Sequence, residues 1–457
     1  MKITILGAGR AGTAAAILAK NKGHEVFVSE SNTNDNPNYL LLEKHDIEFE
    51  KGTHSIDRIM SSDLIIPSPG IKPDNKILIE AINNNIKIID ETAFALRYLS
   101  DNPVIAVTGT NGKTTTVKLI HHLFKSAGKK SHLAGNVGVP LSNLVAEIKP
   151  NDVIILELSS YQLERSERIN PKVSIFLNIS EDHLDWHGNF VNYFASKWKI
   201  TESQSEDNLL VLTLDNDTLI KNAFSEGHRT RANLSAITQK PLRNLGDNFS
   251  SGVFVENGKI FFFKQQGDKP IIKEELMPIS ELAIPGAHNL YNSMAAAIAA
   301  RRFEIPNEDI RDALTSFNGV EHRLEFVRSF QNIDFINDSK ATNINSAWYA
   351  LSSYNKPIVW IAGGTDSEND YSSLDDLVKN NVKTVVSMGE DKDNIFNHFS
   401  SICNCKRAEN LNEALVNAVE SAISGDVILF SPACKSFDQY TNFEERGQDF
   451  KKIVNSL

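Results

Sequence analysis

A glycine-rich stretch in the middle of the chain has the residue types of a phosphate-binding loop. Residues 107–116 read Val-Thr-Gly-Thr-Asn-Gly-Lys-Thr-Thr-Thr and lie between an apolar β-type run and a helical run. Backbone N–H groups at such glycines can turn inward on a phosphate, Lys113 adds a positive charge near the β- and γ-phosphate oxygens, and the Thr114 hydroxyl is placed for Mg²⁺. The loop is a shortened relative of the eight-residue phosphate loop, because position 107 is Val where that spacing has Gly. It predicts a nucleoside triphosphate site.

Side chains that could hold a metal ion follow the next two predicted strands. Glu157 comes directly after an apolar run of four residues, at the carboxyl end of a strand, where a carboxylate can reach Mg²⁺. Residues 180–188, Ser-Glu-Asp-His-Leu-Asp-Trp-His-Gly, include His183, which together with Glu157 could hold a second metal ion but alone would be a packing or capping residue. Lys197 lies in an amphipathic helical run, and from the local sequence it is expected to be an exposed lysine.

A second glycine pattern opens the chain. Gly7-x-Gly9-x-x-Gly12 lies between a strand and a helix, and Glu30 closes the following strand. This context favours a nucleotide diphosphate at the helix N-terminus, and the alternative is a tight turn without a ligand. Residues 68–70, Ser-Pro-Gly, end another parallel strand and belong to the same sheet edge. A nicotinamide-dependent oxidoreductase is an alternative supported by these glycines and Glu30 alone.

Alternating β-type and helical runs predict an α/β protein of three domains. Residues 1–98 form a Rossmann-like domain, 99–319 a central P-loop ATPase-like domain with a mostly parallel sheet, and 320–457 a second Rossmann-like domain. Within the central part, residues 252–263 read as a hairpin with an Asn-Gly turn, and residues 289–302 as a strong helix.

Composition narrows the class of protein. The apolar fraction of 41% is sufficient for folded cores, and 457 residues suit two or three domains. The net charge of −11 disfavours binding to nucleic acid or to an anionic membrane. Three cysteines fit neither a disulfide framework nor a four-ligand zinc site. We expect a soluble, cytoplasmic, monomeric protein with no transmembrane span.

Two phosphate-binding patterns in separate domains are awkward for a dehydrogenase and suit an enzyme that uses ATP on a nucleotide-linked substrate. At this level of detail the chain resembles the Mur ligase family along its full length. The stretches that carry the resemblance are 109–115, 134–140, 157–164, 181–188, 193–200, 286–297, 321–325, 337–343 and 431–450. The last of them, 431–450, is the sharpest mark of the D-glutamate-adding branch of that family.

The resemblance implies an ATP-dependent amide ligase of peptidoglycan precursor synthesis. Such an enzyme joins D-glutamate to UDP-N-acetylmuramoyl-L-alanine through an acyl phosphate, with two Mg²⁺ ions. The residues implied for the UDP-linked substrate are Gly9, Arg10, Ala11, Gly12, Glu30, Ser31, Ser68, Pro69, Gly70 and Asn136. Those implied for ATP are Gly109, Thr110, Asn111, Gly112, Lys113, Thr114, Thr115, Asn289, Arg323 and Asp338.

The resemblance also assigns the metal and amino-acid sites. The metal ligands would be Thr114, Glu157, His183 and Lys197, with Lys197 carrying a carbamate that makes it anionic. The amino acid would be held by Lys340, Thr342, Ser431 and Phe437. The residues with catalytic roles would be Lys113, His183, Lys197 and Lys340.

The chain departs from the family pattern in one place. Ser367 and Glu368 stand where the D-glutamate-adding branch has Lys-Gly, so the amino-acid pocket loses a cation. Lys435 is our candidate substitute, and the alternative is a solvated loop lysine. A ligase for a different acidic amino acid therefore remains an alternative. A non-catalytic regulator is a further alternative, although the intact Lys113 and Glu157 argue against it.

Overall fold

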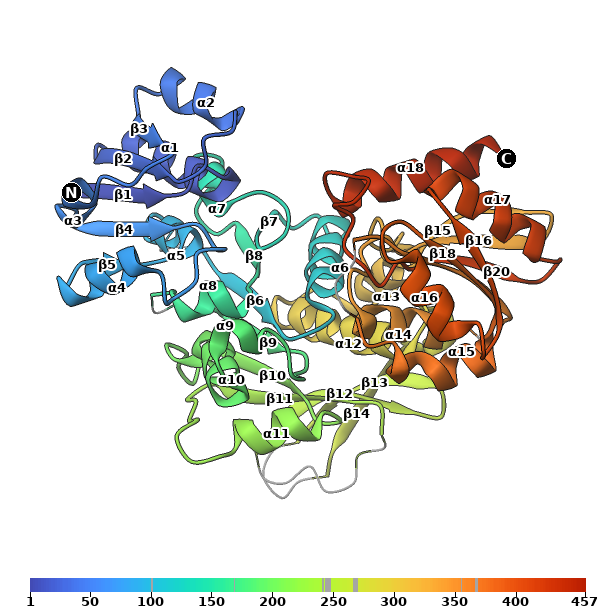
Figure 1. Cartoon of the computed structure of the whole chain (residues 1–457). Helices are drawn as coiled ribbons and strands as arrows, with labels where there is room; N and C mark the ends of the chain where they lie inside the picture. Colours follow the sequence, from blue (N-terminus) through green and yellow to red (C-terminus); the bar gives the residue numbers. More distant parts are fainter. Residues whose placement is uncertain are drawn as a thin grey trace. The chain divides into compact units, whose positions relative to one another are not determined.

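The computed structural model describes residues 1–99, 102–167, 169–240, 242, 248–265, 270–354, 356–365 and 369–457. The chain divides into two compact units, Met1–Ala283 with His288–Phe317 and Ile284–Ala287 with Asn318–Leu457. Among the described residues, no helix is long and apolar enough to cross a bilayer. The units contain three mostly parallel sheets (Figure 1), which confirms the α/β prediction. The predicted domain boundaries near 98 and 319 stay predictions.

The first sheet is parallel throughout and has the strand order β3-β2-β1-β4-β5. Chain order reverses between β1 and β4, which is where open α/β sheets bind ligands. Its strands are β1 (Lys2–Leu6), β2 (Glu25–Glu30), β3 (Glu48–Lys51), β4 (Leu64–Pro67) and β5 (Lys87–Ile88). Its helices are α1 (Arg10–Asn21), α2 (Asn38–Lys44), α3 (Ile56–Met60), α4 (Lys76–Asn83) and α5 (Glu91–Leu96).

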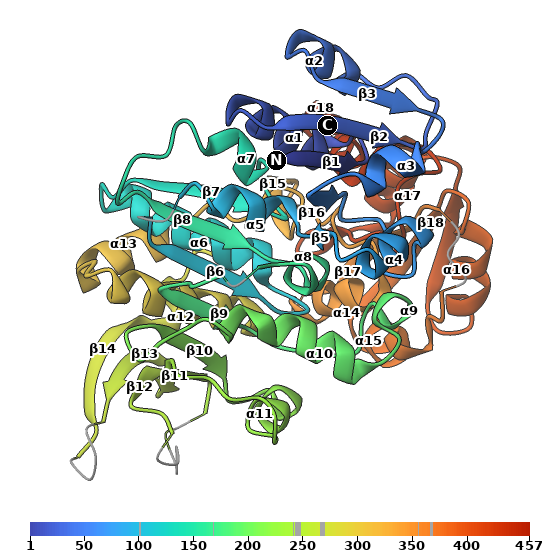
Figure 2. The ribbon, with the colours of Figure 1, turned by 90° about the vertical axis from the view of Figure 1, so that its left-hand side faces the viewer.

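The central sheet has the order β14-β13-β12-β11-β10-β9-β6-β8-β7, with β6 between β8 and β9 (Figure 2). It is parallel from β7 to β12, and β13 and β14 are added antiparallel. Its strands are β6 (Val104–Thr108), β7 (Ser131–Gly135), β8 (Val153–Glu157), β9 (Val173–Phe176), β10 (Leu209–Thr213), β11 (Asn233–Thr238), β12 (Ser251–Glu256), β13 (Lys259–Lys264) and β14 (Ile272–Pro278).

The predicted hairpin and the predicted long helix of this part are both present. Asn257 and Gly258 join β12 to β13 with φ angles of 51° and 73°, as a tight primed turn requires. The helices are α6 (Lys113–Ser126), α7 (Leu141–Leu144), α8 (Ser160–Glu164), α9 (Leu184–His187), α10 (Phe190–Trp198), α11 (Asp217–Ala223), α12 (Ala287–Arg302) and α13 (Asn307–Ser316), with 3₁₀ turns η1 (Lys199–Thr201) and η2 (Ile279–Glu281).

The third sheet has the order β15-β16-β20-β17-β18-β19, and β15 is antiparallel to β16. Its strands are β15 (Glu325–Phe330), β16 (Ile333–Asn337), β17 (Ile358–Gly363), β18 (Val382–Met388), β19 (Asn404–Ala408) and β20 (Val427–Phe430). Its helices are α14 (Ile344–Ser352), η3 (Ser372–Leu374), α15 (Asp375–Asn381), α16 (Lys392–Phe399), α17 (Leu411–Ser421) and α18 (Phe443–Ser456).

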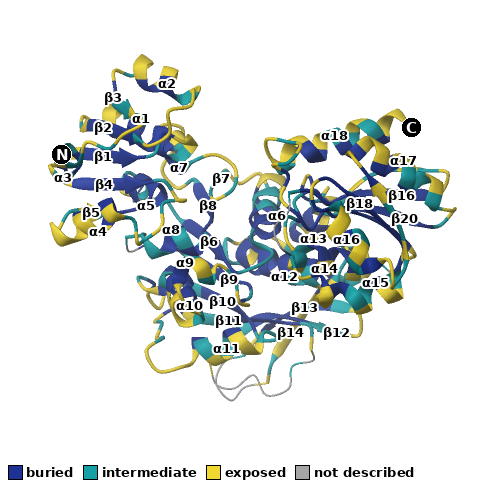
Figure 3. Ribbon diagram, viewed as in Figure 1, coloured by how far each residue is buried: buried dark blue, intermediate teal, exposed yellow. Residues whose placement is uncertain are grey.

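Alternate residues of the third sheet enter two different cores. Trp360 and Leu429 belong to one apolar cluster, whereas their neighbours Val359, Ile428 and Phe430 belong to the other. A parallel sheet covered on both faces requires this continuous burial along its strands. Figure 3 shows that the strands are mostly buried and that helices such as α2 and α4, beside the first sheet, are more exposed. Loops at the strand ends therefore start from rigid positions.

The first and central sheets share one apolar cluster that includes residues of β1, β4, β6 and β8. Two carboxylates are buried beside it. Asp90 caps α5 by accepting from the backbone N–H groups of Thr92 (3.1 Å) and Ala93 (3.0 Å), and Glu91 accepts from the N–H of Ser142 (2.6 Å). Burial raises the pKa of Asp90 to about 7, although the capping bonds oppose this.

This burial predicts a pH-dependent stability. Because its pKa is higher in the folded than in the unfolded chain, Asp90 stabilises the fold at low pH. That contribution is lost as the pH rises from about 4 to about 7, at roughly 1.4 kcal/mol per pH unit. The variant Asp90→Asn keeps a capping oxygen and does not titrate. We expect its free energy of unfolding, measured by denaturant titration, to rise relative to that of the wild type as the pH is raised from 4 to 8.

The control is Asp57→Asn, which changes an exposed acid in the first turn of α3. It should follow the wild-type pH dependence. Parallel curves for the wild type and Asp90→Asn would contradict the prediction.

Candidate functional site

The central glycine-rich loop connects β6 to α6 and is fixed by the end of the neighbouring strand β9. The Asn178 side chain accepts from the Asn111 N–H (2.9 Å) and donates to the Asn111 carbonyl (3.1 Å), and the Asn178 carbonyl accepts from the Thr110 N–H (3.0 Å). Gly112 is left-handed, with φ 84°, and a Cβ there would lie 2.4 Å from the Asn292 side-chain oxygen. Position 112 therefore requires glycine. This glycine lets the loop lead directly into the start of α6, as a phosphate site requires.

Two lysines converge on one backbone carbonyl of this loop. The Lys113 amine donates to the carbonyls of Gly109 (2.9 Å) and Thr110 (3.0 Å), and the Lys197 amine donates to the same Gly109 carbonyl (3.0 Å). The Lys197 side chain is 2% exposed and lies over the Tyr193 ring, 4.8 Å from its centre. Burial lowers the pKa of Lys197 well below the usual lysine value, and repulsion from Lys113 lowers it further. The expectation from the local sequence that Lys197 is exposed is therefore wrong.

Glu157 at the end of β8 is buried beside the loop, as its position in the sequence predicts. One carboxylate oxygen accepts from the Asn136 side chain (2.8 Å), and the Asn136 N–H donates to the Glu157 carbonyl (2.9 Å). The second carboxylate oxygen is buried and has no hydrogen-bond partner, and the Thr115 hydroxyl has none either. A buried carboxylate oxygen without a partner is costly, and a hard divalent cation suits it. This part of the site fits Mg²⁺.

His183 lies in the loop after β9, with a left-handed backbone (φ 54°). Its ring packs on Tyr161, 5.0 Å between centres, and its Nε2 is 3.5 Å from the Asp182 carboxylate. Burial lowers the pKa of His183, and Lys197 lowers it further, while Asp182 opposes both. Within the described residues, His, Cys, Asp and Glu form no cluster of three that could hold a metal ion. A metal site here would need Thr114 or a modified Lys197.

The start of α12 closes the other side of the loop. Asn292 is buried, donates to the Asn289 side chain (3.3 Å) and accepts from the Thr116 hydroxyl (3.2 Å). The structure thus brings Asn289 to the same part of the molecule as the phosphate-type loop. Sequence analysis missed Asn178 and Asn292, although an asparagine three residues after Asn289 in a helix lies on the same face.

The amino-terminal glycines form a close turn at the end of β1. A Cβ at Gly12 would lie 2.1 Å from the Gly7 carbonyl, and one at Gly7 would lie 2.3 Å from the Ser68 hydroxyl. Glu30 accepts from the N–H groups of Ala8 (2.8 Å) and Asn32 (2.8 Å). Burial acts to raise the pKa of Glu30, but these two bonds and the hydrogen bonds from Ser31 together outweigh it, so the pKa is lowered. The strand ends of β1, β2 and β4 therefore meet at one edge, together with the remaining predicted positions Gly9, Arg10, Ala11, Ser31, Pro69 and Gly70.

The second unit gathers the other predicted residues at the ends of β16 and β20. Asp338 is buried, accepting from the Ser431 hydroxyl (2.8 Å) and the Leu324 N–H (3.1 Å). Burial raises the pKa of Asp338 to about 6, and Arg323 opposes this. Lys340 lies over the Phe443 ring, 5.6 Å from its centre.

Other predicted residues of this unit lie in two short loops. The Thr342 N–H donates to the Lys340 carbonyl (3.0 Å). Lys435 is exposed, and Phe437 is 67% exposed. Ser367 and Glu368 lie outside the described residues.

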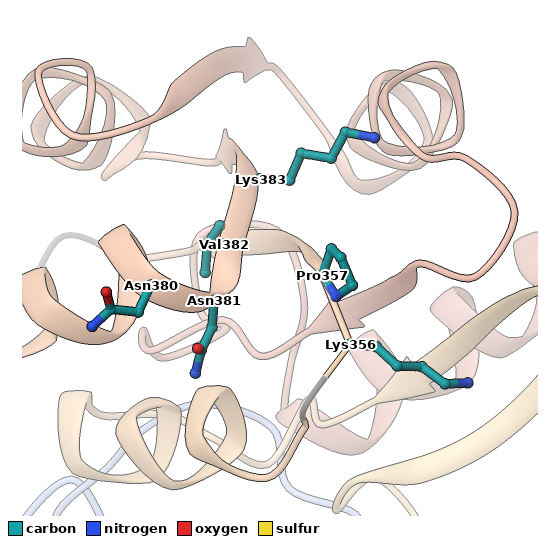
Figure 4. Close-up of a pocket in the computed structure, with 6 residues that line it drawn as sticks. All are labelled: Lys356, Pro357, Asn380, Asn381, Val382 and Lys383. Atoms are coloured by element: carbon teal, nitrogen blue, oxygen red, sulfur yellow. The ribbon is translucent and has the colours of Figure 1, made fainter.

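A hollow of about 290 Å³ in the second unit lies away from these residues. Its lining comes from the starts of β17 and β18 (Figure 4), whereas the predicted residues follow strand ends. Lys356 is paired with Asp334 (2.7 Å) and Lys383 with Asp426 (3.1 Å), so both amines of the hollow already have a carboxylate partner. It is not the candidate site.

Comparison with known proteins matches three successive family models. They are the MurD N-terminal domain over residues 2–77, the Mur ligase middle domain over residues 107–300, and the Mur ligase glutamate ligase domain over residues 322–434. The UDP-N-acetylmuramoylalanine–D-glutamate ligase of Salinibacter ruber is 39% identical, covering 100% of this chain and 98% of that protein. That of Bacteroides fragilis is also 39% identical and covers 100% of both. The chain belongs to the Mur ligase family.

Solved structures support the Mur ligase fold. A UDP-N-acetylmuramate-alanine ligase from Thermotoga maritima matches with a TM-score of 0.60 at 21% identity, covering 100% of this chain and 99% of that one. MurF from Acinetobacter baumannii matches with a TM-score of 0.59 at 17% identity, over 94% of this chain and 85% of that one. These structures confirm the α/β fold class predicted from the sequence, and the family models and curated relatives confirm the family resemblance.

The geometry of Gly112 yields a testable prediction. In Gly112→Ala the new Cβ meets Asn292, and the loop must shift, so the affinity for ATP should fall by more than about tenfold. Gly128→Ala is the matched control, since Gly128 also has a positive φ (68°) but open space around it. Calorimetric titration with ATP and Mg²⁺ measures both. Equal affinities in the two variants would rule out the predicted role of this loop.

Proposed function

We propose that the protein is a cytoplasmic, monomeric, ATP-dependent ligase that adds D-glutamate to UDP-N-acetylmuramoyl-L-alanine. The observation that carries the proposal is the arrangement of Lys113, Lys197 and Glu157 around one glycine-rich loop, in a chain whose relatives at 39% identity bear that name. The reaction joins a carboxylate to an amine, and ATP is the substrate that is broken down.

ATP is assigned to the central loop, from Gly109 to Thr115, with Asn289 beside it. Arg323 and Asp338 of the second unit are proposed as further ATP contacts. The Lys113 ammonium offsets negative charge that develops when a carboxylate approaches a triphosphate. Two Mg²⁺ ions, held by Thr114, Glu157, His183 and Lys197, would supply Lewis-acid stabilisation of the phosphoryl oxygens.

The proposed chemistry has two steps. The lactoyl-alanine carboxylate attacks the γ-phosphorus, the bond to ADP breaks, and an acyl phosphate forms. The D-glutamate amine then attacks the acyl carbon, phosphate leaves, and the amine proton passes to a base or to solvent. Exclusion of water by the bound substrates would limit hydrolysis of the acyl phosphate.

The Lys197 amine is suited to carbamate formation. A lysine whose pKa is lowered well below its usual value by burial and by Lys113 holds more of the neutral amine than an exposed lysine does, and a neutral amine attacks carbon dioxide with loss of a proton. The anionic product would relieve the repulsion between Lys113 and Lys197. We propose this modification as the source of an additional metal ligand.

The UDP portion is assigned to the edge formed by β1, β2 and β4, and Asn136 to the muramoyl end. D-Glutamate is assigned to the second unit, with Lys340, Thr342, Ser431, Phe437 and Lys435 as contacts. The oxidoreductase alternative explains only the edge formed by β1, β2 and β4, and no observation on the central loop favours it.

Phosphate release tests the proposed function. The purified protein is given ATP, Mg²⁺ and UDP-N-acetylmuramoyl-L-alanine, first with D-glutamate and then with other amino acids. We expect release that depends on D-glutamate and disappears when Lys113 is replaced by Ala. Release with a different acidic amino acid would correct the substrate, and no release with any amino acid would favour the regulator.

Lys435 is tested separately as a substitute for the family lysine at position 367. Lys435→Ala should raise the KM for D-glutamate by about three- to tenfold, because a partly solvated charge contributes modestly. Lys379→Ala, an exposed lysine of α15, is the control and should leave that KM unchanged. An unchanged KM in Lys435→Ala would show that Lys435 is an ordinary loop lysine.

A further inference from the structure

Arg446 of α18 is a guanidinium in the interior of the second unit. The residue is 0% exposed. Its N–H groups donate to the Ser339 hydroxyl (3.1 Å) and to the carbonyls of Ser339 (2.9 Å), Cys434 (3.0 Å) and Lys435 (3.1 Å). None of these four acceptors is a carboxylate. Burial lowers the pKa of Arg446 to about 10, so the side chain stays charged at neutral pH.

Burying a charge among neutral acceptors costs desolvation free energy. The position of Arg446 between two loops indicates its role. Ser339 follows β16, directly before Lys340, and the pair Cys434 and Lys435 belongs to the loop after β20. The two loops carry all five proposed amino-acid contacts. Arg446 donates to backbone carbonyls of both loops, which the hydrogen bond from Ser431 to Asp338 also links.

The end of β17 packs on the same point. The Thr365 N–H donates to the Lys435 carbonyl (2.9 Å), which Arg446 also binds. A Cβ at Gly364 would lie 2.2 Å from that carbonyl and 2.9 Å from the Arg446 guanidinium. Three adjacent strand ends, of β16, β20 and β17, therefore meet around one cation.

This arrangement has an electrostatic consequence. The three carbonyl oxygens point toward the guanidinium, so the negative ends of their dipoles face Arg446. The positive charge lies in the interior, where the Asp438 carboxylate partly offsets it and its remaining attraction for an anion is weakly screened. Ser367 stands where the family pattern supplies a lysine, so an acidic substrate gains from a positive charge held elsewhere.

We propose that Arg446 is a positioning residue for the amino-acid substrate, which aligns the 338–342 and 431–438 loops and favours an acidic side chain through its charge. The inference rests on the proposed function and deepens it. Arg446 acts through the loops and is not assigned a contact with the substrate.

The test compares Arg446→Gln, which removes the charge, with Arg446→Lys, which keeps the charge but lacks the planar fork. In Arg446→Gln the KM for D-glutamate should rise by about tenfold or more, while the KM values for ATP and UDP-N-acetylmuramoyl-L-alanine stay within about twofold. Arg446→Lys should show a smaller rise. Formation of the acyl phosphate without amino acid, trapped by borohydride reduction, should persist in both.

Arg328→Gln is the matched control. Arg328 of β15 also donates to backbone carbonyls, those of Val454 (3.4 Å) and Asn455 (3.5 Å) at the end of α18, but touches neither loop. It should leave all three KM values unchanged. Should both Arg446 variants fail to fold, Ser339→Ala removes a single acceptor and should still raise the KM for D-glutamate by about two- to threefold.

Three results separate the inference from the proposed function. If the wild type releases no phosphate with D-glutamate, the proposed function itself fails. If the wild type is active and an unchanged KM for D-glutamate is found in a folded Arg446→Gln or Ser339→Ala, only the inference fails. A parallel rise of all three KM values would show that Arg446 has only a structural role. An equal rise of the KM for D-glutamate in Arg446→Lys and Arg446→Gln would show that the charge does not favour the acidic side chain.

Discussion

The carbonyl oxygen of Gly109 accepts hydrogen bonds from two lysine amines, and the geometry of the central site depends on this shared contact. Lys113 comes from the start of α6 and Lys197 from α10, so two helices are tied to one point of the loop between them. Burial lowers the pKa of the Lys197 amine, and repulsion from the Lys113 ammonium lowers it further. Glu157 contributes the compensating negative charge from the adjacent strand β8. In the proposed function, an anionic triphosphate and divalent cations would complete this set of charges.

The second unit uses a comparable arrangement with a different cation. Arg446 donates to backbone carbonyls of two loops, and Lys113 and Lys197 both donate to the carbonyl of Gly109, so in both places side-chain nitrogens are bonded to neutral backbone oxygens. Each of the two groups lies at the carboxyl end of parallel strands. The strands supply rigid starting points, and the nitrogen donors fix the irregular backbone that follows.

Residue spacing was sufficient to predict the loop of residues 109–115, Glu157 and the hairpin around Asn257, because each depends on local backbone rules. It failed for Lys197, whose burial depends on Tyr193 and on a loop more than 80 residues earlier in the chain. The partners Asn178 and Asn292 were missed for the same reason. Burial of a charged side chain is a tertiary property that local pattern does not contain.

The most direct measurement of the central claim concerns the Lys197 amine. The protein is equilibrated with ¹³C-labelled bicarbonate near neutral pH, and carbon-13 spectra are compared for the wild type and for Lys197→Ala. A buried amine with a lowered pKa should give a carbamate signal in the wild type that is absent from the variant and weakens as the pH is lowered. Lack of that signal, together with a Lys197 amine that titrates at the ordinary lysine value, would contradict the account of the site.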